Sequence, residues 1–237
     1  MLKYTLGDIM SKEHQNIFSD NGIVLTDKQL NQFEKYYELL IEWNDKINLT
    51  AITDKVMVYH KHFLDSLSIK NVMNNDSLTL LDVGSGAGFP SIPLKILYPS
   101  IKVTIIDALL KRINFLNILC KSLDIEVELI HGRAEEYQRK NDFDFVTARA
   151  VANLQLLSEL CIPFVKVDGY FIAMKGPKYK EEVDLCNNAF EVLGARLDSV
   201  YPYNIIEEHR TLLLIKKTRN TDSKYPRRFK LIKNKPL

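Results

Sequence analysis

The sequence predicts an α/β fold built on a sheet of seven strands, mostly parallel with an antiparallel last strand, and preceded by a helical extension. Three observations predict it. Apolar strands alternate with helices from residue 78 onward, and a glycine-rich segment follows the first of these strands. Two further strands near the end of the chain are separated by only a short connection, which favours an antiparallel pair at the edge of the sheet. The arrangement is Rossmann-like.

The N-terminal part of the chain has helical periodicity. Thr26 or Asp27 is expected to cap a first helix, whose apolar residues recur at helical spacing. Residues 43–50 are rich in Asn and Asp and are expected to form a loop. Thr53 or Asp54 then caps a second helix. The turn-rich segment 74–76 marks the expected boundary to the next domain.

The α/β part is predicted element by element from its apolar runs. The expected strands are Thr79–Val83, Val103–Asp107, Glu126–Ile130, Phe143–Thr147, Gly169–Lys175, Arg196–Tyr203 and Thr211–Lys217. The expected helices are Ile92–Leu97, Leu110–Leu123, Leu154–Phe164 and Tyr179–Leu193. Because parallel sheets are covered on both faces, these helices should flank the sheet. A parallel sheet that ends in an antiparallel hairpin resembles the seven-stranded methyltransferase fold.

Charge is distributed unevenly along the chain, whose net charge is +2. Residues 216–237 contain nine Lys or Arg and one acid, which gives this segment a charge of +8. The rest of the chain contains 23 basic and 29 acidic residues and has a charge of −6. We therefore divide the chain into a helical subdomain (1–76), an α/β domain (77–217) and a basic tail (218–237). A basic tail on an acidic body indicates contact with a polyanion, although a solvated, disordered terminus would have the same composition.

Composition excludes several classes of protein. There is no run of eighteen apolar residues and no apolar N-terminal signal region, so neither a membrane span nor secretion is expected. Cys120, Cys161 and Cys186 are odd in number and lie in apolar surroundings, which predicts buried thiols in a reducing compartment. We expect a cytoplasmic monomer, since nothing indicates an obligate assembly.

The segment from Leu80 to Pro90, LLDVGSGAGFP, is the strongest functional signal. Glycines let the chain turn sharply and approach a ligand closely, and this loop follows the first strand, where open α/β sheets bind ligands. A dinucleotide-binding loop would be G-x-G-x-x-G. Here Gly84, Gly86 and Gly88 have the spacing G-x-G-x-G, and Phe89 occupies the sixth position.

This spacing favours S-adenosylmethionine (SAM) over a dinucleotide. SAM brings an amino-acid tail and a sulfonium and has no pyrophosphate, so the carboxylate of Asp82 at the end of the strand suits it. Pro90 and Pro93 remove amide donors that a phosphate would need. Asp107 ends the next strand, where a carboxylate can accept both ribose hydroxyls. The alternative is that the glycines form a structural turn and the two acids are polar strand ends.

Several segments together resemble one family. Besides the loop, which continues as LLDVGSGAGFPSIPLKI, they are WNDKINLTAI, HKHFLDSL, TARAV, MKG, YPRR and KPL, in the family's order along nearly the whole chain. The family is the bacterial 16S ribosomal RNA guanine-N7 methyltransferase, RsmG (glucose-inhibited division protein B). The resemblance implies SAM contacts at Gly84, Phe89, Ala134, Glu135 and Arg149. After YPRR the chain departs from the family pattern, although the tail remains basic.

The resemblance also implies the substrate, a guanine in a 16S RNA loop near the decoding region of the small subunit. Guanine N7 has a lone pair and no proton at neutral pH, so we expect direct in-line transfer without a general base, driven by positioning. No catalytic dyad is identified, and Arg149 and Lys175 are the candidate catalytic residues. Arg227, Arg228, Lys230 and Lys175 are the expected RNA contacts. For Arg149 a surface salt bridge, and for Lys175 a simple strand-ending turn, are the structural alternatives.

Other chemistry is disfavoured by the same residues. Thr147-Ala148-Arg149-Ala150 replaces the Asn/Asp-Pro-Pro-aromatic motif of exocyclic-amine methylation, and Cys161 lies within an apolar helix, where a thiol is inert. His60 and His62 face apart on a helix, so no metal site is expected. Two alternatives stay open: a SAM methyltransferase that acts on a protein or small molecule, and a non-catalytic RNA-binding factor that retains SAM.

Overall fold

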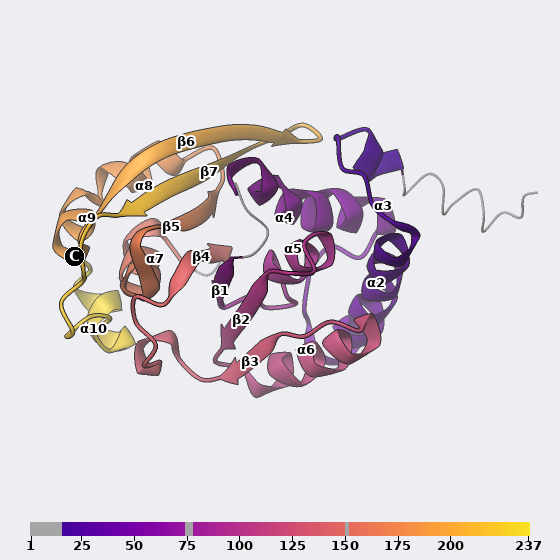
Figure 1. Cartoon of the computed structure of the whole chain (residues 1–237), viewed down its shortest axis with the longest axis horizontal. Coiled ribbons are helices and arrows are strands. Elements are labelled where there is room, and N and C mark those ends of the chain that lie inside the picture. The colour runs from indigo at the N-terminus through magenta and orange to yellow at the C-terminus, as the bar shows by residue number, and fades with distance from the viewer. Residues whose placement is uncertain (1–15, 74–77, 150–151) are drawn as a thin grey trace, which may run out of the picture.

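A computed structural model describes residues 16–73, 78–149 and 152–237. The expected junction at 74–76 therefore lies outside the described residues. The described chain forms one seven-stranded sheet in the order β3-β2-β1-β4-β5-β7-β6, with helices on both faces (Figure 1). No helix among these residues is both long enough and apolar enough to span a membrane.

The strands confirm the predicted sheet. They are β1 (Thr79–Val83), β2 (Lys102–Asp107), β3 (Glu128–His131), β4 (Phe143–Arg149), β5 (Val165–Lys175), β6 (Ala195–Ile205) and β7 (Glu208–Lys217). The first five pair in parallel, whereas β7 is antiparallel to both β5 and β6, so the last two strands form the expected hairpin at the sheet edge. The third strand begins at Glu128, two residues later than predicted.

The helices of the α/β part are α5 (Ser91–Leu97), α6 (Leu110–Leu123), η3 (Ala134–Glu136), α7 (Leu154–Cys161), η4 (Ile162–Phe164), α8 (Tyr179–Asp184), α9 (Asn187–Leu193) and α10 (Phe229–Asn234). The prediction of one continuous helix over Tyr179–Leu193 is wrong, because the chain breaks between α8 and α9. The helix predicted over Leu154–Phe164 tightens to a 3₁₀ turn where Pro163 enters it.

The N-terminal helices begin where the sequence predicts. α2 (Asp27–Ile47) is capped by Thr26, whose side chain accepts from the backbone N–H of Gln29 in a capping box. The prediction that residues 43–50 are a loop is wrong, since α2 continues to Ile47. Its end is made by Asn48 in the left-handed region (φ 50°) and by the Asn44 side chain, which accepts from the N–H groups of residues 49 and 50.

The second predicted helix is a continuous stretch of four segments: α3 (Lys55–Val58), η1 (Tyr59–Leu64), α4 (Asp65–Leu67) and η2 (Ser68–Val72). Asp54 caps it through a bond from the N–H of Met57. The η1 segment is a π-helix, a form that is often found at functional sites.

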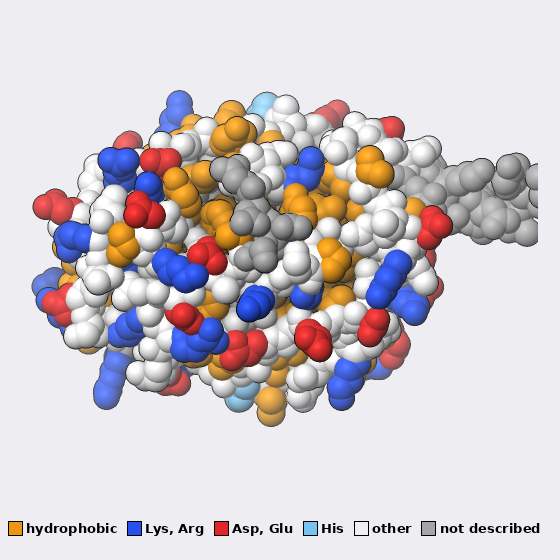
Figure 2. All heavy atoms as spheres, in the orientation of Figure 1, with side chains coloured by type: hydrophobic (Ala, Val, Ile, Leu, Met, Phe, Trp, Pro, Cys, Tyr) orange, Lys and Arg blue, Asp and Glu red, His pale blue; other side chains and the backbone are white. Residues whose placement is uncertain are grey.

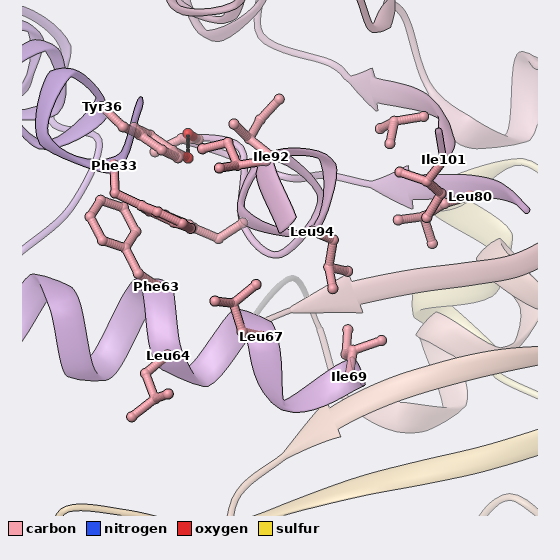
Figure 3. Packing of buried hydrophobic residues seen from close by; sticks show 14 of the residues in the cluster. Phe33, Tyr36, Phe63, Leu64, Leu67, Ile69, Leu80, Ile92, Leu94 and Ile101 are labelled. Carbon is pink, nitrogen blue, oxygen red and sulfur yellow. Dashed lines mark hydrogen bonds between the residues drawn. The ribbon is translucent and has the colours of Figure 1, made fainter. Parts of the chain in front are cut away.

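The core has two parts, one on each face of the sheet. On the first face, aromatic residues of α2 and η1 pack with aliphatic residues of α5 and α6 against the sheet, as Figure 3 shows for Phe33, Tyr36, Phe63 and Ile92. On the other face α7, α9 and α10 cover the sheet. The N-terminal helices therefore share a core with the sheet, which fixes the position of η1 relative to the glycine loop.

Candidate functional site

The glycine loop follows β1 and leads into α5. Gly84, Gly86 and Gly88 all have positive φ angles, of 74°, 62° and 101°. A Cβ atom on Gly88 would lie 2.7 Å from Cγ1 of Ile92 and 2.8 Å from the hydroxyl of Tyr36, so only glycine fits there. A Cβ on Gly86 would meet nothing within 4 Å. Gly88 is therefore wedged into the protein, while Gly86 faces open space.

A cavity of about 480 Å³ opens against this loop. Its walls are the glycine loop after β1, the end of β2 with the residues that follow it, two residues after α2, His62 of η1 and Arg149 of β4. This is the edge at which open α/β sheets bind ligands. The lining residues are Leu49, Thr50, His62, Gly84, Ser85, Gly86, Ala87, Phe89, Asp107, Ala108, Leu109, Arg112 and Arg149.

Asp82 is fully buried beneath the loop. Its Oδ2 accepts from the N–H of Ser91 at 3.3 Å, and Oδ1 has no hydrogen-bond partner among the described residues. Burial raises the pKa of this carboxyl group to about 7. A buried carboxylate with a free oxygen is suited to a positively charged ligand, which would restore its ionised form.

Asp107 is a buried carboxylate at the cavity floor. Its Oδ1 accepts from the N–H of Leu109 at 2.9 Å, and its Oδ2 accepts from the N–H of Gly86 at 3.2 Å and from Nη1 of Arg112 at 3.3 Å. These bonds hold the glycine loop against the end of β2. The carboxylate lies in the cavity wall, at the place predicted for a contact to ribose.

Phe89 lies in a stack of flat groups. Its ring centroid is 5.3 Å from that of Tyr36 and 4.6 Å from that of His62, at interplanar angles of 15° and 25°. The guanidinium carbon of Arg149 lies 4.8 Å from the ring centre. The hydroxyl of Tyr36 donates to the carbonyl of Ala87 at 2.6 Å. The N-terminal helices thereby clamp the glycine loop.

Arg149 ends β4 and forms an ion pair that is shielded from solvent. Its Nη1 lies 2.9 Å from Oδ2 of Asp65 and also donates to the carbonyl of Lys61, and its Nη2 lies 3.2 Å from Nδ1 of His62. The Asp65 side chain is only 8% exposed, and its Oδ1 accepts from the hydroxyl of Tyr203 at 2.8 Å. The exposed salt bridge considered from the sequence is thus a buried network that spans three elements.

His62 links this network to the segment after α2. Burial, together with the nearby charge of Arg149, lowers the pKa of the imidazole to about 4, so the ring is neutral at pH 7. Nε2 lies 2.7 Å from Oγ1 of Thr50, and Nδ1 faces both Nη2 of Arg149, at 3.2 Å, and the carbonyl oxygen of Lys61, at 3.1 Å. The described residues hold no group of three or more potential metal ligands here or elsewhere.

Some residues expected to bind the cofactor lie outside the cavity wall. Ala134, which is buried, and Glu135 belong to the η3 turn after β3, and neither is among the described residues that line the cavity. Oε1 of Glu135 instead accepts from the N–H of Phe229 at 3.3 Å, which joins this turn to the tail. Gly88 and Asp82 support the loop from beneath. The predicted contacts therefore separate into residues of the cavity wall, residues that support the loop, and the two residues of η3, which lie outside the wall.

The residues expected to bind RNA are placed in three different environments. Arg227 contacts Glu159, a fully buried side chain, through Nε at 2.8 Å and Nη2 at 2.7 Å. Arg228 and Lys230 are exposed at the beginning of α10. Lys175 lies at the end of β5, where its side chain is 8% exposed and pairs with Glu182 at 2.7 Å. The tail is therefore folded onto α7, and Arg228 and Lys230 are the exposed members of the predicted set.

Sequence reasoning did not assign a role to Thr50, Asp65, Tyr203 or Arg210. Asp65 lies in the quoted segment HKHFLDSL, three residues after His62, which places both side chains near each other on one helix. Tyr203 and Arg210 lie in the edge hairpin, and no local sequence pattern connects them with the glycine loop.

Comparison with known proteins gives matches along most of the chain. The family described as rRNA small subunit methyltransferase G matches residues 29–211. Proteins named ribosomal RNA small subunit methyltransferase G from Bacillus cytotoxicus and Streptococcus agalactiae serotype Ia are 50% and 48% identical to the chain. These alignments cover 92% and 93% of this chain and 94% and 97% of the relatives.

Solved structures with similar folds are more distant in sequence. A SAM-dependent methyltransferase from Aquifex aeolicus is 20% identical with a TM-score of 0.54, and the match covers 74% of this chain and 97% of that one. M. jannaschii TYW2, solved in complex with AdoMet, is 16% identical with a TM-score of 0.55, and the match covers 65% and 77% of the two chains. At this identity the likeness establishes the fold alone.

Proposed function

The chain belongs to the rRNA small subunit methyltransferase G family, and we propose that it transfers the methyl group of SAM to N7 of a guanine in a decoding-region loop of 16S RNA. The observation that carries this proposal is that the cavity beside the glycine loop lies within the part of the chain that matches the family. All residues that line the loop cavity fall between Leu49 and Arg149, inside the matched range 29–211.

The residues of the loop cavity fit SAM. The carboxylate of Asp107 lies in the cavity wall and suits ribose hydroxyls, and the buried carboxylate of Asp82 beneath the loop favours a cationic ligand through its charge. The glycine loop permits close approach of the backbone. When bound there, SAM supplies an activated methyl group on a sulfonium. We propose that Gly84, Gly86, Asp107 and Phe89 hold or border it, with Asp82 and Gly88 supporting the loop.

Transfer to N7 requires positioning and no base. N7 presents an in-plane lone pair and has no proton to lose at neutral pH, so the role of the protein is to align and desolvate the two groups. Methylation of a pyrimidine carbon would need a reactive thiol. Burial raises the pKa of Cys161 well above its ordinary value and that of Cys186 to about 11, which opposes such chemistry.

We further propose that the exposed cations of the tail bind ribosomal RNA phosphates. Arg228, Lys230, Lys233 and Lys235 are exposed on or beside α10. Removing one cation that binds a phosphate should reduce the steepness of log affinity against log salt by about 0.7–0.9. We expect this from Lys230→Gln. Lys28→Gln is the matched control, because Lys28 is also exposed and lies in α2, on the other side of the molecule (Figure 1).

The test of the main proposal is methyl transfer from labelled SAM to small ribosomal subunits that lack the modification, with the position of the label mapped by mass spectrometry. Wild-type protein should form 7-methylguanosine in 16S RNA. Gly84→Asp should form none, because it adds a negative charge at a position that lines the cavity and replaces glycine at φ 74° by a residue that resists this conformation. Absence of transfer by the wild type to subunits or to naked 16S RNA would refute the proposal.

A further inference from the structure

A second cavity, of about 350 Å³, lies beside the loop cavity and shares His62 and Arg149 with it. Its other walls come from distant parts of the chain: Ile52 after α2, Lys175 at the end of β5, and Arg210 in β7. Its volume is in the range of small-molecule sites. Because two side chains line both cavities, a group held in the second cavity lies next to the first.

The edge hairpin forms one wall of this second cavity. Tyr203 and Arg210 are directly paired across β6 and β7, so their side chains project from the same face of the sheet. Tyr203 is fixed by its bond to Asp65, and Glu208 pairs with both Lys61 and Arg210. These contacts join the hairpin to η1 and α4, and Figure 1 shows the hairpin running along one edge of the sheet toward the N-terminal helices. Figure 2 shows blue Lys and Arg side chains and red Asp and Glu side chains interspersed on this face of the molecule.

Two of the described side chains that line this cavity, Arg210 and Lys175, have N–H groups without an acceptor among the described residues. Nε of Arg210 is buried and has no acceptor among the described residues. The ammonium of Lys175 donates to the carbonyl of Ala152 at 3.2 Å and to Glu182 at 2.7 Å, which leaves its third N–H. Both oxygens of Asp65, the acid in this wall, already accept bonds. The cavity is therefore complementary to a hydrogen-bond acceptor.

We propose that this second cavity receives the guanine to be methylated, and that Arg210 and Lys175 donate hydrogen bonds to its O6 carbonyl. This inference rests on the proposed function. O6 lies beside N7 on the same edge of guanine, whereas adenine has an amino group at that place. An amino group would face donors and leave them unpaired, so the same groups that position guanine reject adenine.

The basic character of the second cavity supports a nucleotide as its occupant. Lys61, Arg149, Lys175 and Arg210 line it, and of the acids that pair with them only Asp65 lines the cavity. Ile52 and Met174 add apolar surface against which a planar base can pack. A base that reaches this cavity must leave its stack, which is possible for a nucleotide in a loop.

The experiment compares Arg210→Gln with Arg196→Gln, a control in β6 whose side chain is 66% exposed and pairs only with Asp198 among the described residues. With unmodified small subunits as substrate, Arg210→Gln should lower kcat/KM by about 10- to 100-fold. It should leave the Kd for SAM within about twofold, and Arg210→Lys should recover part of the loss. Arg196→Gln should match the wild type.

A second substrate separates recognition of O6 from general damage to the protein. Subunits reconstituted with 2-aminopurine at the target position retain N7 and lack O6. On them Arg210→Gln and wild type should have equal kcat/KM, because the deleted donor has no acceptor there. The inference would be overturned if Arg210→Gln lowered kcat/KM by the same factor on both substrates. It would also be overturned if Arg210→Gln were as active as Arg196→Gln on the guanine substrate. Failure of the wild type on guanine would instead refute the proposed function.

Discussion

The two neighbouring cavities differ in how the chain builds them. Most of the loop cavity comes from two short segments, the loop from Gly84 to Phe89 and the stretch from Asp107 at the end of β2 into the start of α6. The second cavity is assembled from the N-terminal helices, β5 and the edge hairpin, which are far apart in sequence. The first is organised by backbone conformation and the second by side-chain ion pairs. Local sequence therefore specifies the first, and tertiary packing specifies the second.

This difference predicts different responses to mutation. A backbone-built cavity should be sensitive to any added side chain at its glycines. A cavity built from charged side chains should tolerate backbone changes nearby and depend on individual partners. Arg149 and His62 belong to both cavities, so changes there should affect both.

The largest effect is expected for Gly88→Ala. The new Cβ would collide with Ile92 and the hydroxyl of Tyr36, at a φ of 101° that disfavours any side chain. Strain and overpacking together should lower the free energy of unfolding by about 2–5 kcal/mol and abolish measurable SAM binding. Thermal unfolding and calorimetric titration with SAM measure the two effects.

Two other glycines calibrate this prediction. Gly86→Ala has the same chemistry in open space but keeps a positive φ, so it should cost about 1–2 kcal/mol. Gly132→Ala meets nothing within 4 Å and should change stability by less than about 0.5 kcal/mol. If all three variants lost the same amount of stability, close packing of Gly88 against Ile92 and Tyr36 would not be what shapes the loop cavity.

Arg149→Gln should have the next largest effect. It leaves the buried carboxylate of Asp65 without its ion pair and removes the cation from the face of Phe89. We expect a loss of about 3 kcal/mol in stability and of about 100-fold in kcat/KM for methyl transfer. Arg139→Gln, which removes two exposed ion pairs, should cost at most about 1 kcal/mol and leave transfer unchanged.

The fold was predictable because its determinants are local and repeated. Helix caps such as Thr26 and Asp54 mark where the helices begin. The apolar runs mark the strands, and the short connection before β7 indicates the antiparallel pair at the sheet edge. The loop predicted at residues 43–50 was wrong for a tertiary reason. Trp43 and Ile47 pack against the core, which extends the helix through Asn44 and Asp45 despite their weak helix propensity.

The site was predictable only in part. The glycine loop, Asp82 and Asp107 are adjacent to strand ends, so their convergence follows from the topology. The tail residues Arg227 and Lys230 look equivalent in sequence, yet one binds buried Glu159 and the other is exposed. The contact of Asp65 with Arg149 and Tyr203 joins residues that are 84 and 138 positions apart, and no local pattern carries this information.

A smaller effect is expected from pH, through Asp82. The pKa of Asp82 is raised to about 7, so below that pH the folded protein without ligand holds a proton on this carboxyl group that the unfolded chain has released. The stability that Asp82 contributes to the folded state is therefore lost as the pH rises toward 7. A cationic ligand needs the ionised carboxylate. Affinity for SAM should therefore increase by about 5- to 10-fold between pH 6 and pH 7.5, measured by calorimetry. Asp82→Asn should bind weakly with no such rise, and a pH-independent wild type would contradict this role.

The smallest effect concerns the support of the loop by α2. Tyr36→Phe keeps the stacked ring and removes one buried hydrogen bond, from the Tyr36 hydroxyl to the carbonyl of Ala87. It should cost about 1–1.5 kcal/mol in stability and raise the Kd for SAM by less than about tenfold. Tyr37→Phe is the matched control, since its hydroxyl donates to Thr53 at an exposed position and 3.2 Å. If Tyr36→Phe and Tyr37→Phe had the same unfolding temperature and the same Kd for SAM, α2 would hold the glycine loop through the aromatic stack alone.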